Sequence, residues 1–199
     1  DPRTGVVLAM FSSPTYNPNL LVGHERGNNA AKLYQDPYKP FFIRPIQAYY
    51  PPGSSFKPLS ALIALEEGII TPQTTYYCPG HYWAGNHKVD CFHGEAHGIV
   101  NLSSAVAESC NGYFSMVFEK LMNYYGAKNT SSTFTNWRNN VEKFGLGNKL
   151  GLDMPGEARG NVPTAKHYDK IYRPGGWRSS NIISLAIGQG ELDATPLQL

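Results

Sequence analysis

The chain has 199 residues, of which 41% are hydrophobic and 16% charged, enough apolar side chain for the core of one domain or most of one. Its 17 basic and 15 acidic residues leave a net charge of +2, so charge gives no reason to expect nucleic acid or an anionic membrane as a partner. Within these residues no run approaches the roughly 18 apolar residues that a membrane span needs, and none has the pattern of a signal peptide.

The first third of the chain is predicted to hold a strand, a loop and two helices. Residues 6–11 form an apolar run that predicts a buried strand, residues 12–19 a loop with two prolines, and residues 28–34 a short helix. A longer helix is expected to begin at Ser54 and end at Gly68. Its apolar face would be formed by Phe56, Leu59, Leu62, Ile63 and Leu65.

The rest of the chain alternates between irregular and helical patterns. Residues 71–100 are rich in glycine, histidine and aromatic residues and show little periodicity. Helical stretches follow at residues 102–107 and 113–124. A further helical stripe, more typical of core than of a ligand platform, consists of Phe134, Trp137, Val141 and Phe144. Residues 145–178 are again loop-rich.

Ser54 and Lys57 place a hydroxyl and an amine three residues apart at the start of the predicted helix. Residues i and i+3 lie on one helix face, so the lysine amine can reach the serine oxygen. A serine needs a neighbouring base to become a nucleophile, and a desolvated lysine can lose its charge and serve as that base. Alone the pattern is weak, because most such pairs are a capping serine and a surface lysine.

Ser109, Cys110 and Asn111 form a second polar element at the junction of two helical stretches. Such a turn can project a hydroxyl and an amide into a cleft. Ser109 could then relay a proton between lysine and leaving group, and Asn111 could orient a substrate amide. The alternative is a polar turn between helices with no chemical role.

The two motifs, in this order, resemble the superfamily of penicillin-binding proteins and serine β-lactamases. Longer segments resemble the elongation group of class B penicillin-binding proteins, that of penicillin-binding protein 2. These segments are DPRTGVVLAM (1–10), YPPGS (50–54), GQG (188–190) and ATPLQ (194–198). They run from one end of the chain to the other. The resemblance implies an α+β transpeptidase fold with a helical core and a sheet.

A third motif of the superfamily, Lys-Thr/Ser-Gly on a strand beside the nucleophile, does not occur in this sequence. We therefore expect residues 1–199 to be the N-terminal and central part of a transpeptidase domain whose C-terminal part is absent. The backbone N–H of Ser54 would be one oxyanion-hole donor, and the other would come from the third-motif strand. The isolated fragment is accordingly expected to be inactive.

For the parent protein, the resemblance implies a peptidoglycan D,D-transpeptidase. Ser54 would attack a stem peptide ending in D-Ala-D-Ala, with Lys57, Ser109 and Asn111 as the other catalytic residues, and β-lactams would acylate Ser54. It also implies an N-terminal membrane anchor, a position on the periplasmic face of the inner membrane, and a membrane glycosyltransferase and other elongation-complex proteins as partners. Two alternatives stay open: a serine β-lactamase or β-lactam sensor, and a non-catalytic scaffold module.

The three cysteines and one histidine suggest a metal site. Cys78, Cys91, His97 and Cys110 have the spacing Cys-x12-Cys-x5-His-x12-Cys and span the irregular stretch, and zinc takes four such ligands in a closed structural site. The resemblance favours His97, but three other histidines compete for the fourth position: His81, His87 and His93. Further alternatives are a Cys78–Cys91 disulfide and three unlinked thiols.

Cys110 connects the metal hypothesis to the second motif. Cys110 lies between Ser109 and Asn111. Its side chain would therefore point away from the cleft that its two neighbours face. A structural zinc that holds Cys110 from behind would fix the turn and would not act on the substrate.

Overall fold

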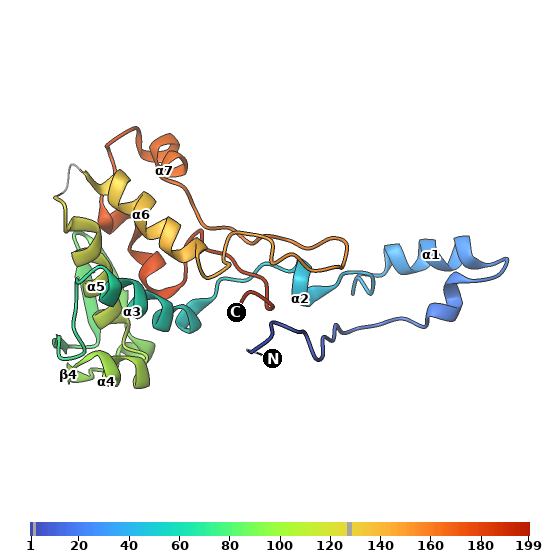
Figure 1. Ribbon diagram of the computed structural model, residues 1–199, viewed down its shortest axis with the longest axis horizontal. Coiled ribbons are helices and arrows are strands. Elements are labelled where there is room, and N and C mark those ends of the chain that lie inside the picture. The colour runs from blue at the N-terminus through green and yellow to red at the C-terminus, as the bar shows by residue number, and fades with distance from the viewer. Residues whose placement is uncertain (2, 127–128) are drawn as a thin grey trace.

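The computed structural model describes residues 1, 3–126 and 129–199; Pro2 of the opening segment lies outside them. Figure 1 shows an elongated molecule, with a helical body at one end and an arm at the other. We define the arm as residues 1–43. It carries the 3-10 helix η1 (Pro18–Leu21) and the helix α1 (Arg26–Gln35), which confirms the helix predicted at 28–34. The short helix α2 (Arg44–Gln47) joins the arm to the body.

The strand predicted at residues 6–11 is wrong. These residues form no strand and pair with none among the described residues, and Val6, Leu8 and Phe11 are 55%, 79% and 77% exposed. An apolar run becomes a strand only where a neighbouring strand satisfies its backbone N–H and C=O groups.

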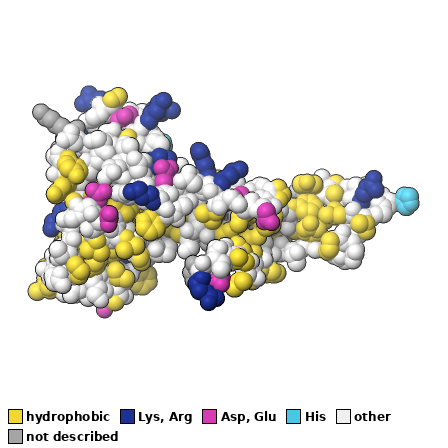
Figure 2. Space-filling model, viewed as in Figure 1, with side chains coloured by type: hydrophobic (Ala, Val, Ile, Leu, Met, Phe, Trp, Pro, Cys, Tyr) yellow, Lys and Arg dark blue, Asp and Glu magenta, His cyan; other side chains and the backbone are white. Residues whose placement is uncertain are grey.

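Aromatic contacts hold the arm together. The ring centre of Phe41 lies 4.8 Å from that of Tyr16, in the loop before η1, and 4.8 Å from that of Tyr34, in α1. The Phe41 ring therefore connects the loop with the helix. Hydrophobic side chains gather along the arm in Figure 2. They border a hollow of about 510 Å³ between the loop and α1, which Tyr38 and Leu20 help to line.

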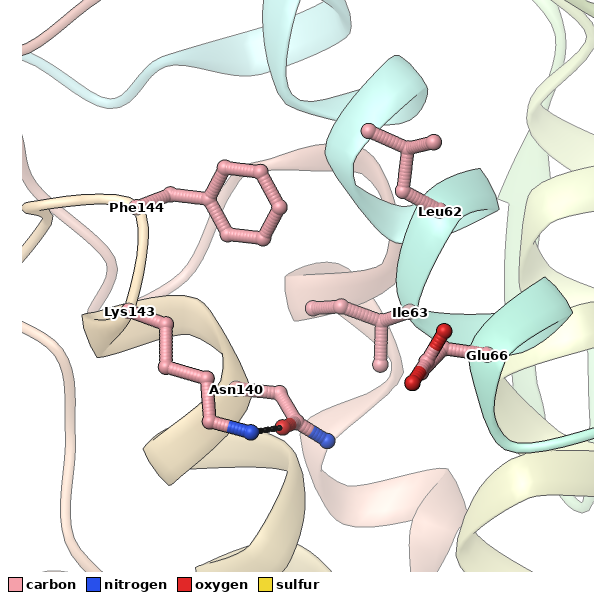
Figure 3. A pocket seen from close by; sticks show the side chains of 6 residues that line it. All are labelled: Leu62, Ile63, Glu66, Asn140, Lys143 and Phe144. Atoms are coloured by element: carbon pink, nitrogen blue, oxygen red, sulfur yellow. Dashed lines mark hydrogen bonds between the residues drawn. The ribbon is translucent and has the colours of Figure 1, made fainter.

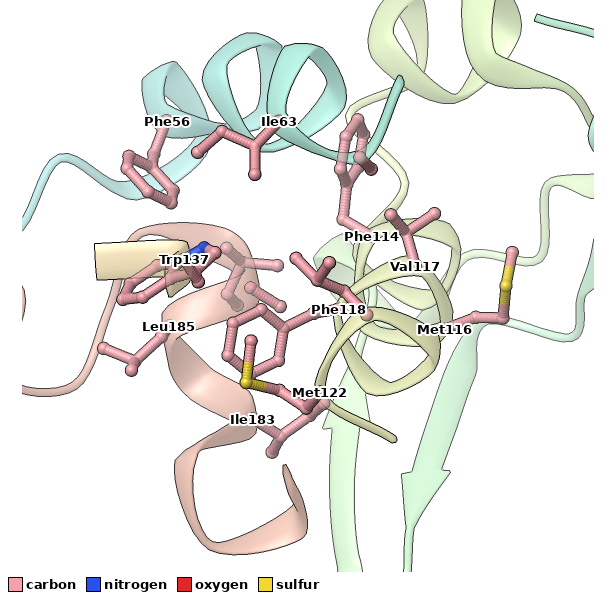
Figure 4. Packing of buried hydrophobic residues seen from close by; sticks show 14 of the residues in the cluster. Phe56, Ile63, Phe114, Met116, Val117, Phe118, Met122, Trp137, Ile183 and Leu185 are labelled. Carbon is pink, nitrogen blue, oxygen red and sulfur yellow. The ribbon is translucent and has the colours of Figure 1, made fainter. Parts of the chain in front are cut away.

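The core of the body lies between four helices. The 3-10 turn η2 (Gly53–Phe56) leads into α3 (Lys57–Glu66), which packs with α5 (Asn111–Asn123), α6 (Thr130–Glu142) and the 3-10 segment η5 (Ser179–Ile187). Figure 4 shows their apolar side chains interdigitated. Trp137 is central to this packing, with its ring 5.6 Å from that of Phe118 and 5.2 Å from that of Phe134.

Two residues of the predicted apolar faces lie outside this core. Leu62 is 52% exposed on α3, and Phe144 is 53% exposed because α6 ends at Glu142, before the stripe is complete. The other members of the α6 stripe, Phe134, Trp137 and Val141, are buried as predicted.

Residues 71–100 are more regular than their sequence indicates. They hold two antiparallel pairs, with β1 (Tyr76–Cys78) on β4 (Gly98–Val100) and β2 (His81–Ala84) on β3 (His87–Asp90), and the 3-10 turn η3 (Phe92–Gly94). Strands of three or four residues are too short to show a period in the sequence. With α4 (Leu102–Ala107) and α5 beyond them, these small sheets confirm the α+β class.

The last part of the chain is loop-rich as predicted, with the helix α7 (Ala165–Tyr172) inside it. Tyr168 and Trp177 anchor this region in the core, each 1% exposed. Among the described residues, none of the helices has the length and apolar character required to cross a membrane.

Candidate active site and metal centre

Ser54 lies in η2, at the start of the helix that continues as α3. Gly53 enters this turn with φ of 58°, a left-handed conformation that favours glycine. Its N–H donates to the carbonyl of Gly188 at 2.7 Å. A Cβ on Gly188 would lie 2.4 Å from the Gly53 carbonyl oxygen, so the two glycines meet backbone to backbone. This close approach fixes the position from which Ser54 projects, exposed to solvent.

Lys57 follows one turn later and is buried, at 1% exposure. Its Nζ donates to Ser54 Oγ at 3.0 Å, as the three-residue spacing predicts. It also donates to Ser109 Oγ at 2.7 Å and to Asn111 Oδ1 at 2.6 Å. One ammonium group therefore gathers the side chains of both motifs, which are more than 50 residues apart in the chain.

Ser109 adopts a left-handed conformation, with φ of 52°, which is unusual for a residue with a side chain. In this conformation its hydroxyl donates to Ser54 Oγ at 2.9 Å, and its carbonyl accepts from Lys57 Nζ at 2.6 Å. Asn111 is the first residue of α5. Its amide nitrogen Nδ2 points away from Lys57 and donates to the carbonyl of Asp90 at 2.8 Å. The amide is thereby held with its oxygen toward Lys57.

Burial lowers the pKa of Lys57 to about 8, while negative charge on the nearby Cys110 and Cys91 would act in the opposite direction. Desolvation disfavours the charged ammonium, which is the form with the stronger hydration. A neutral amine at 3.0 Å from a serine hydroxyl can accept its proton. The arrangement thus contains an exposed hydroxyl, a base beside it and a second hydroxyl in contact with both.

The three cysteines and His97 meet behind this cluster. Their four ligand atoms all lie within 4.8 Å of one another, and the Sγ of Cys78 lies 3.5 Å from both the Sγ of Cys91 and the Nδ1 of His97. The cysteines are free and buried. His97 is the histidine of this group, which His81, His87 and His93 do not join.

The donor set fits a metal ion. The Sγ–Sγ separation of 3.5 Å is far longer than a disulfide bond and suits two thiolates on one tetrahedral ion. Burial raises the pKa of Cys78, but hydrogen bonds from His97 and from the Gly80 N–H outweigh it and lower that pKa to about 7. The Tyr113 N–H donates to the Sγ of Cys110 at 3.4 Å. Such N–H groups stabilise metal-bound thiolates, so these residues could hold a metal ion.

The Penicillin binding protein transpeptidase domain model matches residues 1–199. The chain belongs to the penicillin-binding protein transpeptidase family. The peptidoglycan D,D-transpeptidase MrdA of Acinetobacter baumannii is 36% identical over 201 residues, which cover 100% of this chain and 28% of that protein. A crystal structure of penicillin-binding protein 2 from Pseudomonas aeruginosa, also 36% identical, has a TM-score of 0.85 over 99% of this chain and 41% of that one.

Other solved transpeptidase structures are captured with partners or inhibitors. Penicillin-binding protein 2 of Helicobacter pylori, in complex with MreC, is 34% identical with a TM-score of 0.80 over 94% of this chain and 33% of that one. A penicillin G acyl-enzyme of penicillin-binding protein A from M. tuberculosis is 26% identical with a TM-score of 0.72, over 99% and 42% of the two chains. The present chain spans 28–30% of the length of the first curated relatives it matches.

The sequence alone predicts neither of two further contacts that hold the Ser54 cluster. The Asp90 carbonyl that holds Asn111 leaves no signal, because any residue carries a carbonyl. Gly188 belongs to the GQG segment that supports the family resemblance, but its contact with Gly53 requires the folded chain.

A hollow of about 360 Å³ lies apart from this cluster, between α3 and the end of α6 (Figure 3). Leu62 and Ile63 of α3 face Phe144 across it, and Glu66 and Lys143 stand at its edge. None of its lining residues belongs to the Ser54 cluster.

Proposed function

We propose that this chain supplies the nucleophile and its proton-transfer groups to a peptidoglycan D,D-transpeptidase that cross-links the wall during elongation. The single observation that carries this proposal is the set of hydrogen bonds from Lys57 Nζ to Ser54, Ser109 and Asn111. The penicillin-binding protein transpeptidase family to which the chain belongs supports it.

In the proposed reaction, neutral Lys57 accepts the Ser54 proton as Oγ attacks the penultimate carbonyl of a stem peptide ending in D-Ala-D-Ala. The terminal D-Ala leaves with a proton delivered through Ser109, whose hydroxyl contacts both Lys57 and Ser54. Asn111 orients the substrate amide. An amine of a neighbouring stem peptide then attacks the acyl-enzyme and forms the cross-link, whereas a β-lactam acylates Ser54 and stays.

Cys78, Cys91, His97 and Cys110 would hold a structural zinc ion. Three thiolates and one imidazole make a closed donor set with no position for substrate or water. The ion would supply rigidity: Cys110 lies between Ser109 and Asn111, and its buried side chain points into the metal cluster while theirs contact Lys57. Asp90, the last residue of β3 and the neighbour of Cys91, holds the Asn111 amide through its backbone carbonyl.

The proposal extends to the partners and location of the whole protein. We propose that the whole protein is anchored in the inner membrane with its catalytic domain in the periplasm, and that it works with a membrane glycosyltransferase and other elongation-complex proteins. The H. pylori relative in complex with MreC and a peptidoglycan synthase complex that coordinates polymerization and crosslinking support the proposed partners.

The test uses this chain continued through a Lys-Thr/Ser-Gly strand, which we call the extended protein. A pentapeptide ending in D-Ala-D-Ala is supplied with an amine acceptor, and both D-Ala release and cross-linked peptide are measured. A transpeptidase yields both, and Ser54→Ala yields neither. Rapid hydrolysis of β-lactams without cross-linking would instead favour a β-lactamase, and the absence of both reactions a scaffold module.

A further inference from the structure

Two of the three cysteines are brought together by the backbone around them. The N–H of Cys91 donates to the carbonyl of Gly80 at 2.8 Å, next to the pair His81 and Asp90 that closes the β2–β3 ladder. The Sγ atoms of Cys78 and Cys91 lie 3.5 Å apart. A disulfide requires about 2.05 Å, so this pair needs only a small closing movement.

Cys110 reaches the same cluster from the helices. It is the N-cap residue of α5, where its Sγ accepts from the N–H of Tyr113 at 3.4 Å. Its own N–H donates to the carbonyl of Ala105 in α4 at 2.9 Å. Cys110 is thus fixed to α4 and α5, whereas Cys78 and Cys91 are fixed to the small sheets. Cys78 and Cys91 are therefore the pair that can join with the least change in the backbone.

A single short loop separates this cluster from solvent on one side. Residues 92–96, between Cys91 and His97, are all exposed, and His97 is half-buried. The cysteines themselves are at most 3% exposed. Exposed loops open locally at low cost compared with a packed core. Opening of residues 92–96 would admit a molecule as small as hydrogen peroxide and leave the helical core intact.

We propose that Cys78 and Cys91 are an oxidation site for hydrogen peroxide, and that the disulfide they form releases the bound zinc and switches off the Ser54 cluster. This inference rests on the proposed zinc site and on the proposed function of Ser54. It assigns to the same residues a second, oxidised state that holds no metal.

The oxidation takes place in two balanced steps. The sulfur of one thiolate attacks hydrogen peroxide, breaks its O–O bond and becomes a sulfenic acid, with release of hydroxide. The second thiolate attacks that sulfur, displaces another hydroxide and closes the disulfide. The two sulfurs lose two electrons, which the peroxide oxygens gain. His97 and Cys110 then remain as two ligands, too few for a closed tetrahedral zinc site.

Closure of the disulfide affects the Ser54 cluster at two points. The carbonyl of Asp90, which accepts from Asn111 Nδ2 at 2.8 Å, belongs to the residue directly before Cys91 and moves when Cys91 moves. Cys110, directly before Asn111, loses the ion that held it. Both supports of the Asn111 turn change together, so the amide no longer holds its position beside Lys57.

The test treats the extended protein, purified with zinc, with hydrogen peroxide that is afterwards removed by catalase. A zinc-sensitive dye measures the released metal, and mass spectrometry of unreduced peptides locates the disulfide. We expect about one zinc released per chain, a Cys78–Cys91 disulfide and a free Cys110 thiol. The rate of penicillin labelling at Ser54 should fall about tenfold or more, as is typical when the support of a site is lost.

Reversal separates the disulfide from other damage. A phosphine reductant together with zinc should restore the labelling rate, which methionine oxidation would not allow, because sulfoxides require a dedicated reductase. The matched control is reduced protein from which a chelator has removed the zinc. Zinc alone should restore this control, whereas the peroxide-treated protein should need the reductant as well.

Four results would overturn the proposal. Peroxide might leave the three thiols free, or the disulfide might include Cys110. The Cys78–Cys91 disulfide might form without any loss of labelling at Ser54. Zinc alone might restore the peroxide-treated protein, which would show that metal loss and not the disulfide stops the reaction.

The untreated protein separates this inference from the proposals on which it rests. Its zinc content tests the zinc site alone, and its penicillin labelling tests the role of Ser54 alone. If it holds no zinc or is never labelled, that proposal is wrong, and the disulfide map still decides whether Cys78 and Cys91 are the oxidation site. If it holds zinc and is labelled but peroxide changes neither, only the oxidation site is wrong.

Discussion

Lys57 lies at the centre of the site, with its ammonium group among oxygen atoms of Ser54, Ser109 and Asn111. An ammonium has three N–H donors and no acceptor, so the protonated residue stabilises the cluster but cannot activate the serine. Proton transfer requires the neutral amine. The proposed role of Lys57 therefore depends on its protonation state, which two experiments can examine.

Replacement of Lys57 by arginine should abolish acylation almost as completely as replacement by alanine. A guanidinium keeps its proton and cannot serve as a base, and loss of a general base typically costs roughly 10²–10⁴-fold in rate. The measurement is the rate of penicillin acylation of the extended protein, with melting temperatures as the control for folding. A folded arginine variant that acylates at close to the wild-type rate would show that only the charge matters.

The rate of acylation should rise with pH. Burial lowers the pKa of Lys57 to about 8, so the neutral amine is the minor form at pH 7, at about one molecule in ten, and the major form above pH 8. The rate should increase up to tenfold between pH 7 and pH 9 and then level off. A profile that is flat from pH 6 to pH 9 would exclude Lys57 as the titrating base.

The predictability of the site differs from residue to residue. The contact between Ser54 and Lys57 follows from a spacing of three residues on one helix, which is a local property. The approach of Ser109 and Asn111 to Lys57 was expected from the family resemblance alone, because no local rule joins residues more than 50 positions apart. The Asp90 carbonyl that holds Asn111 was beyond prediction, since a backbone atom carries no sequence signature.

At the scale of elements, the turn that carries Ser54 is held by the GQG segment at the end of η5. The N–H of Gly53 donates to the Gly188 carbonyl, and both glycines have left-handed backbones. The sequence predicted α3 as a helix and GQG (188–190) as a family segment, whereas it gave no expectation for η5, which ends just before that segment. Their contact depends on the packing of both elements around Phe56 and Leu185 (Figure 4).

Gly188→Ala should therefore destabilise the protein more than an ordinary glycine replacement. Gly188 and Gly68 have nearly equal φ angles, 68° and 67°, so alanine costs each about 1–2 kcal/mol of backbone strain. At Gly188 the new Cβ would also meet the Gly53 oxygen at 2.4 Å, whereas at Gly68 nothing lies within 4 Å. Thermal unfolding of the two variants measures the difference, and equal melting temperatures would contradict it.

Cys78, Cys91, His97 and Cys110 join β1, the loop after β3, the residue before β4 and the start of α5. If they hold zinc as proposed, its binding should couple to folding. Elemental analysis should give about one zinc per chain, and a chelator should lower the melting temperature. Single replacements of Cys78, Cys91, His97 or Cys110 should each lose the metal. The matched controls, His81→Ala, His87→Ala and His93→Ala, should retain it.

Two results would contradict this account of the metal. The first is a Cys78–Cys91 disulfide in metal-free protein of unchanged stability, which would show that a covalent link and not zinc joins these residues. Retention of zinc after His97→Ala would move the fourth ligand to another histidine.

At the scale of the whole molecule, the family resemblance predicted the α+β class, and the body agrees with it. The arm was predicted less well, because the apolar run at residues 6–11 has the composition of a strand but no partner among the described residues (Figure 1). A strand depends on its neighbour, whereas the helix α1 satisfies its backbone internally and was recognisable from the sequence.

The central claim is that Ser54 is the nucleophile, and mass spectrometry of the extended protein after exposure to penicillin tests it most directly. We expect one penicillin adduct per molecule, mapped to the peptide that contains Ser54, and no adduct in Ser54→Ala. Ser55→Ala is the matched control, because its hydroxyl donates to the Pro52 carbonyl and not to the cluster, and it should be labelled like the wild type. An adduct that persists in Ser54→Ala, or that maps to Ser55 or Ser109, would contradict the account.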